Sequence, residues 1–223
     1  MLAQIVLFDG FDPLDVIAPY EVLFAGGAFA DGALSVELVS AEGPRPVPSG
    51  TGPLVLQATA GLDPARADLI VVPGASGRVG GGDGLGDEEP GEDTIPVILG
   101  RTLRTGLPVL LKAALDQPGL TVAAVCGGSL VLAMAGLIEG RHATTHHLGM
   151  DLLDATGVIA VDARVVDDGD LVTGAAVTSG LDLGLYLLER ELGPRIAHAT
   201  EQLFAYERRG TVWREHGAVP GAF

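Results

Sequence analysis

The chain has 223 residues, 48% of them hydrophobic, and a net charge of −16 at pH 7. This length supports a full hydrophobic core in one α/β domain. Nucleic acids and anionic membranes require a basic surface, so the 29 Asp and Glu against 13 Lys and Arg argue against both as partners.

Targeting signals and cysteine content further limit the class of protein to which the chain can belong. The N-terminal residues carry no basic region of a signal peptide, and Gly, Pro or charge interrupts each apolar run before it reaches membrane-spanning length. A single cysteine, Cys126, excludes an intrachain disulfide. We therefore expect a cytoplasmic protein with one domain over residues 1–207 and a surface tail over residues 208–223.

The first half of the chain alternates strand and helix patterns. Apolar runs that end at Gly, Pro or Asp predict strands, and apolar residues at helical spacing predict helices. The predicted strands are 4–8, 35–40, 53–57 and 68–72, and the predicted helix is 15–24. Pro19 is expected near the first turn of that helix, where proline is tolerated. Residues 43–52 are expected to form a Pro/Gly-rich connector.

A turn at 73–77 follows the fourth strand, and Gly, Asp and Glu dominate residues 77–93. That composition predicts a solvated loop rather than a cation site. Further along, the patterns predict helices at 94–103, 107–115, 130–135, 148–155, 178–191 and 194–206, and strands at 121–125, 158–166 and 171–174. The last two strands should form a hairpin around 167–170. Ser179 and Asp182 resemble a capping box.

Three histidines, His142, His146 and His147, lie within six residues. No second cluster of ligands has recognisable spacing, and strand alternation would place His142 and His146 on one face and His147 off it. We therefore predict no metal site.

Cys126 lies between the predicted strand 121–125 and the following helix, and Gly127 and Gly128 come directly after it. A tight strand-to-helix turn pushes the side chain at its apex into the crevice at the strand ends. The helix N-terminus favours thiolate, so we expect the thiol pKa to fall from ~8.5 to roughly 3.5–7.5. A lone cysteine is more often a buried small hydrophobe. Because the glycines leave the sulfur uncovered, we favour a reactive thiol.

The alternation of strands and helices predicts a doubly wound α/β sandwich with a mostly parallel sheet. Sites in such folds lie outside the carboxyl ends of the strands. Cys126, the turn at Gly74 and Ala75, and the turn before Asp15 all fall at this edge. Three loops are therefore expected to converge on one crevice.

These residues resemble the ThiJ/PfpI family of the class I glutamine amidotransferase-like superfamily. The resemblance rests on residues 125–129, 135–141, 143–146, 14–16 with Pro19, 72–74 and 171–174, and it covers about 4–192. Within the family the motifs are most similar to isonitrile (isocyanide) hydratases and to the amidase-like sensor domain of certain transcription regulators. The resemblance implies a flavodoxin-like fold, a cysteine nucleophile, no cofactor and a homodimer.

The resemblance also implies roles for single residues. Cys126 takes the place of the nucleophile and Asp15 that of the acid that hydrogen-bonds its sulfur, while the backbone around Gly74, Ala75 and Gly127 falls where developing negative charge is bound. A buried carboxylic acid can stay protonated and later deliver its proton. The alternative for Asp15 is a carboxylate that only complements the helix dipole.

In the hydratase reading, Cys126 attacks the carbon of an isocyanide, Asp15 protonates it, and water releases an N-substituted formamide. Gly127 stands where the hydratases usually carry threonine, which leaves the substrate open. Thr145 and His146 are candidate site-lining residues, although His146 is equally well explained as a structural histidine at a strand end. The alternatives are a glyoxalase or deglycase-like enzyme on reactive carbonyls, with a base such as His146, and a non-enzymatic ligand or redox sensor that uses Cys126.

Overall fold

The computed structural model describes residues 1–79, 91–219 and 221. A seven-stranded sheet runs through its centre in the order β10-β11-β7-β6-β1-β2-β5. Its strands are β1 (Leu2–Val6), β2 (Ser35–Ser40), β5 (Ala60–Gly61), β6 (Leu69–Val72), β7 (Thr121–Val125), β10 (Val165–Asp167) and β11 (Leu171–Gly174). Every neighbouring pair is parallel except β10 with β11. The order β2-β1-β6-β7-β11 is that of flavodoxin-like folds, so the predicted fold class is confirmed.

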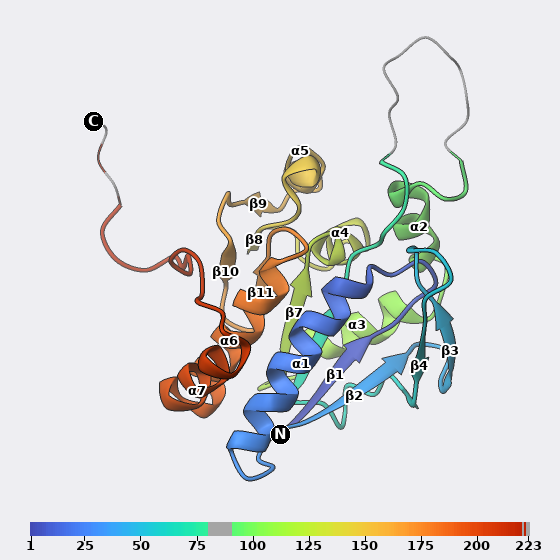
Figure 1. Cartoon of the computed structure of the whole chain (residues 1–223). Coiled ribbons are helices and arrows are strands. Elements are labelled where there is room, and N and C mark those ends of the chain that lie inside the picture. Colours follow the sequence, from blue (N-terminus) through green and yellow to red (C-terminus); the bar gives the residue numbers. More distant parts are fainter. Residues whose placement is uncertain (80–90, 220, 222–223) are drawn as a thin grey trace.

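Helices cover both faces of this sheet (Figure 1). The helices α1 (Pro13–Phe29), α6 (Ser179–Leu192) and α7 (Pro194–Phe204) pack against one another in front of the sheet in that view. Behind it, α3 (Leu107–Leu115) and α4 (Gly128–Met134) pack on β7, and α2 (Ile95–Thr102) packs on α4. With helices on both faces, the central strands are buried on both sides, which explains their continuous apolar sequences.

Glycines bring α1 and α6 close together. A Cβ at Gly184 would lie 2.9 Å from Cγ1 of Val22, and one at Gly26 would lie 2.3 Å from a methyl carbon of Leu188. Both distances are shorter than ordinary carbon contacts, so these glycines allow an approach that larger residues would prevent. The close packing fixes α1, which carries Asp15, against the rest of the domain.

Several predicted boundaries were wrong. Helix α1 starts at Pro13 rather than at residue 15, so Pro19 lies in its interior and not near its first turn. The connector predicted over 43–52 contains β3 (Arg45–Pro48), which pairs with β4 (Val55–Ala58) in a separate antiparallel hairpin. Two prolines in four residues concealed β3, because proline lacks the N–H that a central strand needs and is confined to edge strands and strand ends.

The segment around the three histidines also differs from its prediction. The strand β8 spans only His142–Ala143 and pairs with β9 (Ile159–Ala160), and a 3₁₀ turn, η1 (His147–Gly149), then leads into α5 (Met150–Ala155). His146 therefore does not share a strand face with His142. The strand predicted over 158–166 is split into β9 and β10, whereas the hairpin of β10 and β11 is confirmed.

The capping box predicted at Ser179 is absent. Thr178 occupies the N-cap position, and Oγ of the buried Ser179 has no hydrogen-bond partner among the described residues. Asp182 instead accepts hydrogen bonds from Nε of Arg164 at 2.6 Å, from the Tyr206 hydroxyl at 3.0 Å and from the Arg209 backbone N–H at 2.7 Å. Its carboxylate thus attaches the C-terminal segment to α6.

Residues 208–223 were expected to form a surface tail. Their first part makes specific contacts, because the Trp213 N–H donates to the Val165 carbonyl at 2.9 Å and the Trp213 carbonyl accepts from the Asp167 N–H at 2.9 Å. These bonds place the segment beside the outer edge of β10. The predicted loop at 77–93 lies mostly outside the described residues. None of the described helices combines the length and apolar composition that crossing a bilayer requires.

Candidate active site

Three chain segments meet at the carboxyl ends of β1, β6 and β7. Strand β1 leads into α1 on one side of the topological switch between β1 and β6, and β6 ends at Val72 opposite Ala124 of β7. The turn at Gly74 and the turn at Cys126 therefore begin at neighbouring positions along this edge of the sheet. Crevices at such switch points are the usual ligand sites of doubly wound folds.

Cys126 lies at the apex of the turn between β7 and α4. Its φ of +55° is a left-handed conformation that costs a non-glycine residue about 1–3 kcal/mol. Three hydrogen bonds hold it there: its N–H donates to the Gly174 carbonyl at 3.0 Å, and its carbonyl accepts from Oγ1 of Thr145 at 2.8 Å and from Oγ of Ser129 at 3.2 Å. The strained elbow keeps 7% of Cys126 accessible at the crevice.

Thr145 was predicted to line the site, but it is buried, is not among the described lining residues of the cavity at Cys126, and donates its hydroxyl to the Cys126 carbonyl. We expect Thr145→Val to lower the kcat of a reaction at Cys126 several-fold, because the Cys126 carbonyl loses its shorter hydrogen bond. The same loss should lower the free energy of unfolding by about 1 kcal/mol. Thr200→Val is the matched control, since Thr200 is equally buried and donates to the Ile196 carbonyl in α7. Urea unfolding and steady-state kinetics of both variants check this. An equal loss of kcat in both variants would refute a local role.

Asp15 is the third residue of α1 and is fully buried. Its Oδ2 accepts the Gly74 N–H at 2.9 Å, while no N–H or O–H donor of the described residues reaches its Oδ1. Burial raises the pKa of this carboxyl well above its usual value, and the negative charge of Asp12 adds to the shift. The hydrogen bonds from Gly74 and Cys126 only partly oppose it. Together these effects favour the protonated form of the Asp15 carboxyl.

The pKa of the Cys126 thiol is also raised, mainly by burial and then by the neighbouring Asp15 carboxylate, against the opposing hydrogen bond from the Gly127 N–H. The sequence-based expectation of a lowered pKa is therefore wrong. Helix α4 has only seven residues, and its dipole does not overcome desolvation. Once Asp15 holds its proton, burial remains as the main cause. Burial thus favours the uncharged forms of both Cys126 and Asp15.

Gly74 permits the close approach of these segments. A Cβ at this position would lie 2.6 Å from the Gly127 nitrogen and 2.9 Å from Oδ2 of Asp15. We expect Gly74→Ala to lower kcat/KM by about 100-fold, because small misplacements of reacting groups are costly, and to destabilise the protein by about 1–3 kcal/mol. The control is Gly100→Ala in α2, where a Cβ meets no atom within 4 Å. Retained activity in Gly74→Ala would show that this spacing is not needed.

Two backbone N–H groups face the crevice. Neither the Ala75 nor the Gly127 N–H donates to a carbonyl or side-chain oxygen of the described residues, and both residues line the cavity at Cys126. Free, pre-aimed N–H groups can stabilise a developing negative charge. The role that the family resemblance implies for Ala75 and Gly127 stays a prediction.

A cavity of about 270 Å³ opens from Cys126. Its described walls are mainly apolar, and Asp12 and His146 are their only ionisable members besides Cys126. The apolar side chains on these walls are Val79, Ile95, Pro96, Leu99, Leu130, Met134, Leu148, Leu152 and Val177. Such walls suit a small uncharged molecule.

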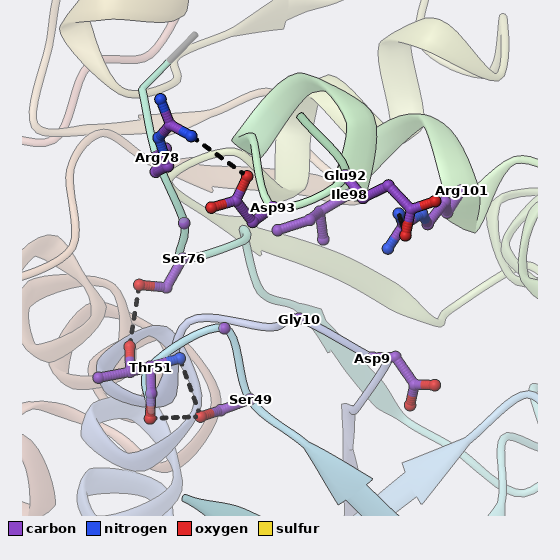
Figure 2. A pocket seen from close by; sticks show the side chains of 12 residues that line it. Asp9, Gly10, Ser49, Thr51, Ser76, Arg78, Glu92, Asp93, Ile98 and Arg101 are labelled. Carbon is purple, nitrogen blue, oxygen red and sulfur yellow. Dashed lines mark hydrogen bonds and ion pairs between the residues drawn. The ribbon is translucent and has the colours of Figure 1, made fainter. Parts of the chain in front are cut away.

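A larger neighbouring cavity, of about 630 Å³, shares Ser76 and Gly77 with the first (Figure 2). Figure 2 shows its polar lining, in which Arg78 pairs with Asp93 at 3.8 Å and Thr51 donates to Ser76 at 2.9 Å. Neither cysteine nor histidine occurs among its described lining residues. We therefore assign the chemistry to the smaller cavity.

His146 lies on the wall of the smaller cavity, but its ring is engaged. Its Nδ1 accepts the Leu148 N–H at 3.2 Å, and burial together with the adjacent His147 lowers its pKa. A neutral ring that accepts at Nδ1 carries its proton on Nε2 and has no free nitrogen to take the thiol proton. His142 lies elsewhere, with Nδ1 3.2 Å from Asp168. Within the described ranges, no group of three or more His, Cys, Asp or Glu is arranged to hold a metal ion.

Two contributors to the site were not predicted from the sequence. Asp12 lines the cavity and caps α1, since its Oδ1 accepts the Leu14 N–H at 2.8 Å. An Asp directly before Pro is the signal of a helix start with proline at the first position. Ser129 supports the elbow carbonyl. A small polar residue just after the two glycines gave no comparable signal.

Comparison with known proteins agrees with this geometry. The DJ-1/PfpI family profile matches residues 102–190. The chain is 34% identical to isonitrile hydratase from Pseudomonas putida over 201 residues, which cover 90% of this chain and 76% of that protein. It is 33% identical over 121 residues to the HTH-type transcriptional regulator CdhR from Pseudomonas aeruginosa, covering 52% of this chain and 36% of the regulator.

Solved structures show the same fold. A ThiJ/PfpI family protein from Pseudomonas syringae superposes with a TM-score of 0.73 at 24% identity and covers 94% of this chain and 76% of its own. Drosophila melanogaster DJ-1beta also gives 0.73, at 18% identity, and covers 92% of this chain and 98% of its own.

Proposed function

The chain belongs to the DJ-1/PfpI family, and on this basis we propose that it is a cysteine-dependent hydratase that adds water to a small electrophile. Isocyanides are the favoured substrates, with N-substituted formamides as products. The 34% identity to isonitrile hydratase over most of both chains supports this choice.

One observation carries the proposal: the Cys126 thiol lines an apolar cavity, and behind it lies the buried Asp15 carboxyl, whose pKa is raised. Burial favours the protonated form of Asp15, and the strained elbow presents Cys126 to the cavity. An isocyanide has a terminal carbon that accepts a proton and a nucleophile at one position. Neutral apolar walls suit its substituent.

The first half-reaction starts from the resting pair. Asp15 donates its proton to the terminal carbon of the isocyanide while the Cys126 sulfur bonds to that carbon, and the thiol proton passes to the Asp15 carboxylate. The product is a thioimidate on Cys126, and Asp15 is again protonated. All atoms and charges balance, and no cofactor is needed. Acid catalysis of this kind typically contributes about 10²- to 10⁴-fold.

The second half-reaction releases the product. Water adds to the thioimidate carbon and one of its protons passes to the substrate nitrogen. The carbon–sulfur bond then breaks, the thiol regains a proton, and an N-substituted formamide leaves. The N–H groups of Ala75 and Gly127 are placed to stabilise negative charge in these steps, and one such donor contributes about 3–4 kcal/mol in other enzymes.

The proposal is tested by offering the purified protein two electrophiles side by side. We expect N-alkylformamide from an alkyl isocyanide and no lactate from methylglyoxal, both measured by NMR. Lactate without formamide would contradict the hydratase proposal and support the glyoxalase-like alternative. His146 disfavours that outcome, because its Nδ1 accepts the Leu148 N–H.

The sensor alternative is supported by the transcriptional regulators among the relatives. The match to one of them, CdhR, covers 36% of the length of the regulator. A raised thiol pKa argues against easy oxidation of Cys126, because oxidants react with the thiolate. The homodimer remains a prediction, which light scattering coupled to size-exclusion chromatography would check.

A further inference from the structure

Asp12 is a second acidic residue at the cavity, and the reaction steps above do not use it. It is half-buried at the N-cap of α1 and lines the wall next to Cys126. Its Oδ1 accepts the Leu14 N–H at 2.8 Å, and its backbone N–H donates to the Gly74 carbonyl at 2.9 Å. The N–H of that same Gly74 donates to Oδ2 of Asp15. Asp12 thus touches both segments that hold Asp15.

We propose that Asp12 is a positioning residue for the hydration reaction: it anchors the start of α1 to the Gly74 turn and holds a negative charge at the cavity wall, three residues before Asp15. This inference rests on the proposed role of Asp15 as the acid.

Asp12 is the main charged neighbour of Asp15. The other groups that act on Asp15 are the uncharged Gly74 N–H, in the turn after β6, and the Cys126 thiol, at the elbow. His146 on the cavity wall has a lowered pKa and is neutral. None of the described lining residues of this cavity is Lys or Arg. Arg78 belongs to the neighbouring cavity, where it pairs with Asp93 (Figure 2).

Two opposing effects act on Asp15, and Asp12 helps to decide between them. Asp15 lies in the first turn of a 17-residue helix, whose positive end favours a carboxylate. The Gly74 N–H favours the carboxylate as well. Burial works the other way, and the negative charge of Asp12 at the N-cap of this helix is the second largest cause that raises the pKa of Asp15. A charge at the N-cap thus offsets the helix dipole where the acid needs its proton.

The test removes this charge and keeps the cap. Asparagine and serine cap helices about as well as aspartate, so Asp12→Asn and Asp12→Ser retain the geometry of α1. Either variant should move the basic limb of the pH–rate profile to lower pH. On that limb hydration should slow about 3- to 10-fold relative to wild type, with little change at lower pH. Glu21→Gln removes the same charge from an exposed position further along α1 and should leave the profile unchanged.

A second readout does not depend on turnover. In protein labelled with ¹³C at the aspartate carboxyls, the Asp15 resonance is assigned by its absence in Asp15→Asn and followed through a pH titration. We expect it to titrate at lower pH in both Asp12 variants than in wild type and Glu21→Gln. An unchanged titration in the Asp12 variants, or an equal shift in Glu21→Gln, would overturn the proposal. A shifted titration in a protein without isocyanide turnover would reject the hydratase function and leave the role of Asp12 standing.

Discussion

Replacing Cys126 with serine is expected to lower kcat/KM for isocyanide hydration by roughly 10⁴- to 10⁶-fold, the loss seen when a covalent nucleophile is removed. A serine hydroxyl is a far weaker nucleophile than a thiol and has no adjacent base here. The raised pKa of Asp15 favours its protonated form, and the Nδ1 of His146 accepts the Leu148 N–H. The serine variant therefore has no way to activate its oxygen. Formamide production followed by NMR measures the effect.

The control for this substitution separates chemistry from folding. Cys126→Ser should change the free energy of unfolding by less than about 1–2 kcal/mol, because the replacement is nearly isosteric. Met134→Leu changes another side chain on the cavity wall and should alter kcat/KM by no more than a few-fold. Undiminished turnover in a folded Cys126→Ser variant would remove the thiol from the mechanism.

The second large effect is expected from Asp15→Asn. The amide fills the same volume and can still accept the Gly74 N–H, but it has no acidic proton to give to the substrate carbon. The hydration rate should fall about 10²- to 10⁴-fold. In wild type, kcat should decline as the pH rises through the raised pKa of Asp15. The pH–rate profile of Asp15→Asn should lack this decline. An unchanged rate in Asp15→Asn would mean that the proton comes from another donor.

The same substitution should stabilise the fold. The folded protein keeps the Asp15 proton at pH values where the unfolded chain has lost it. The free energy of unfolding of wild type therefore falls as pH rises from the unfolded-state pKa, about 3.9, towards the folded-state value. Asparagine has no such proton, so the free energy of unfolding of Asp15→Asn should not fall over this range. It should come to exceed that of wild type by about 1–2 kcal/mol, a gain typical of substitutions at functional sites. Urea titrations at several pH values measure it.

Elements with strong local signals were predictable from the sequence. The strand β7 and the helix α3 match their predicted ranges, since apolar runs bounded by turn residues leave little ambiguity. The strand β3 was missed because it contains two prolines, and β5 because it has only two residues. Their pairing depends on neighbouring strands rather than on local sequence.

The proximity of the candidate site residues was predictable, but their electrostatics were not. Cys126, Asp15 and the Gly74 turn could be placed at one edge of the sheet, because parallel strands bring their carboxyl ends together. The direction of the thiol pKa shift could not, since it depends on how deeply tertiary packing buries the pair. Asp12 was overlooked because the start of α1 was set at residue 15, which hid its cap.

The covalent thioimidate is the central claim, and rapid acid quenching during turnover followed by mass spectrometry tests it most directly. Because Cys126 is the only cysteine, a thiol adduct has one location. We expect wild-type protein mixed with an alkyl isocyanide to carry one substrate mass on the peptide that contains Cys126, and to lose it as formamide accumulates and substrate runs out. Formamide production by a protein that carries no adduct at any quench time would contradict the account.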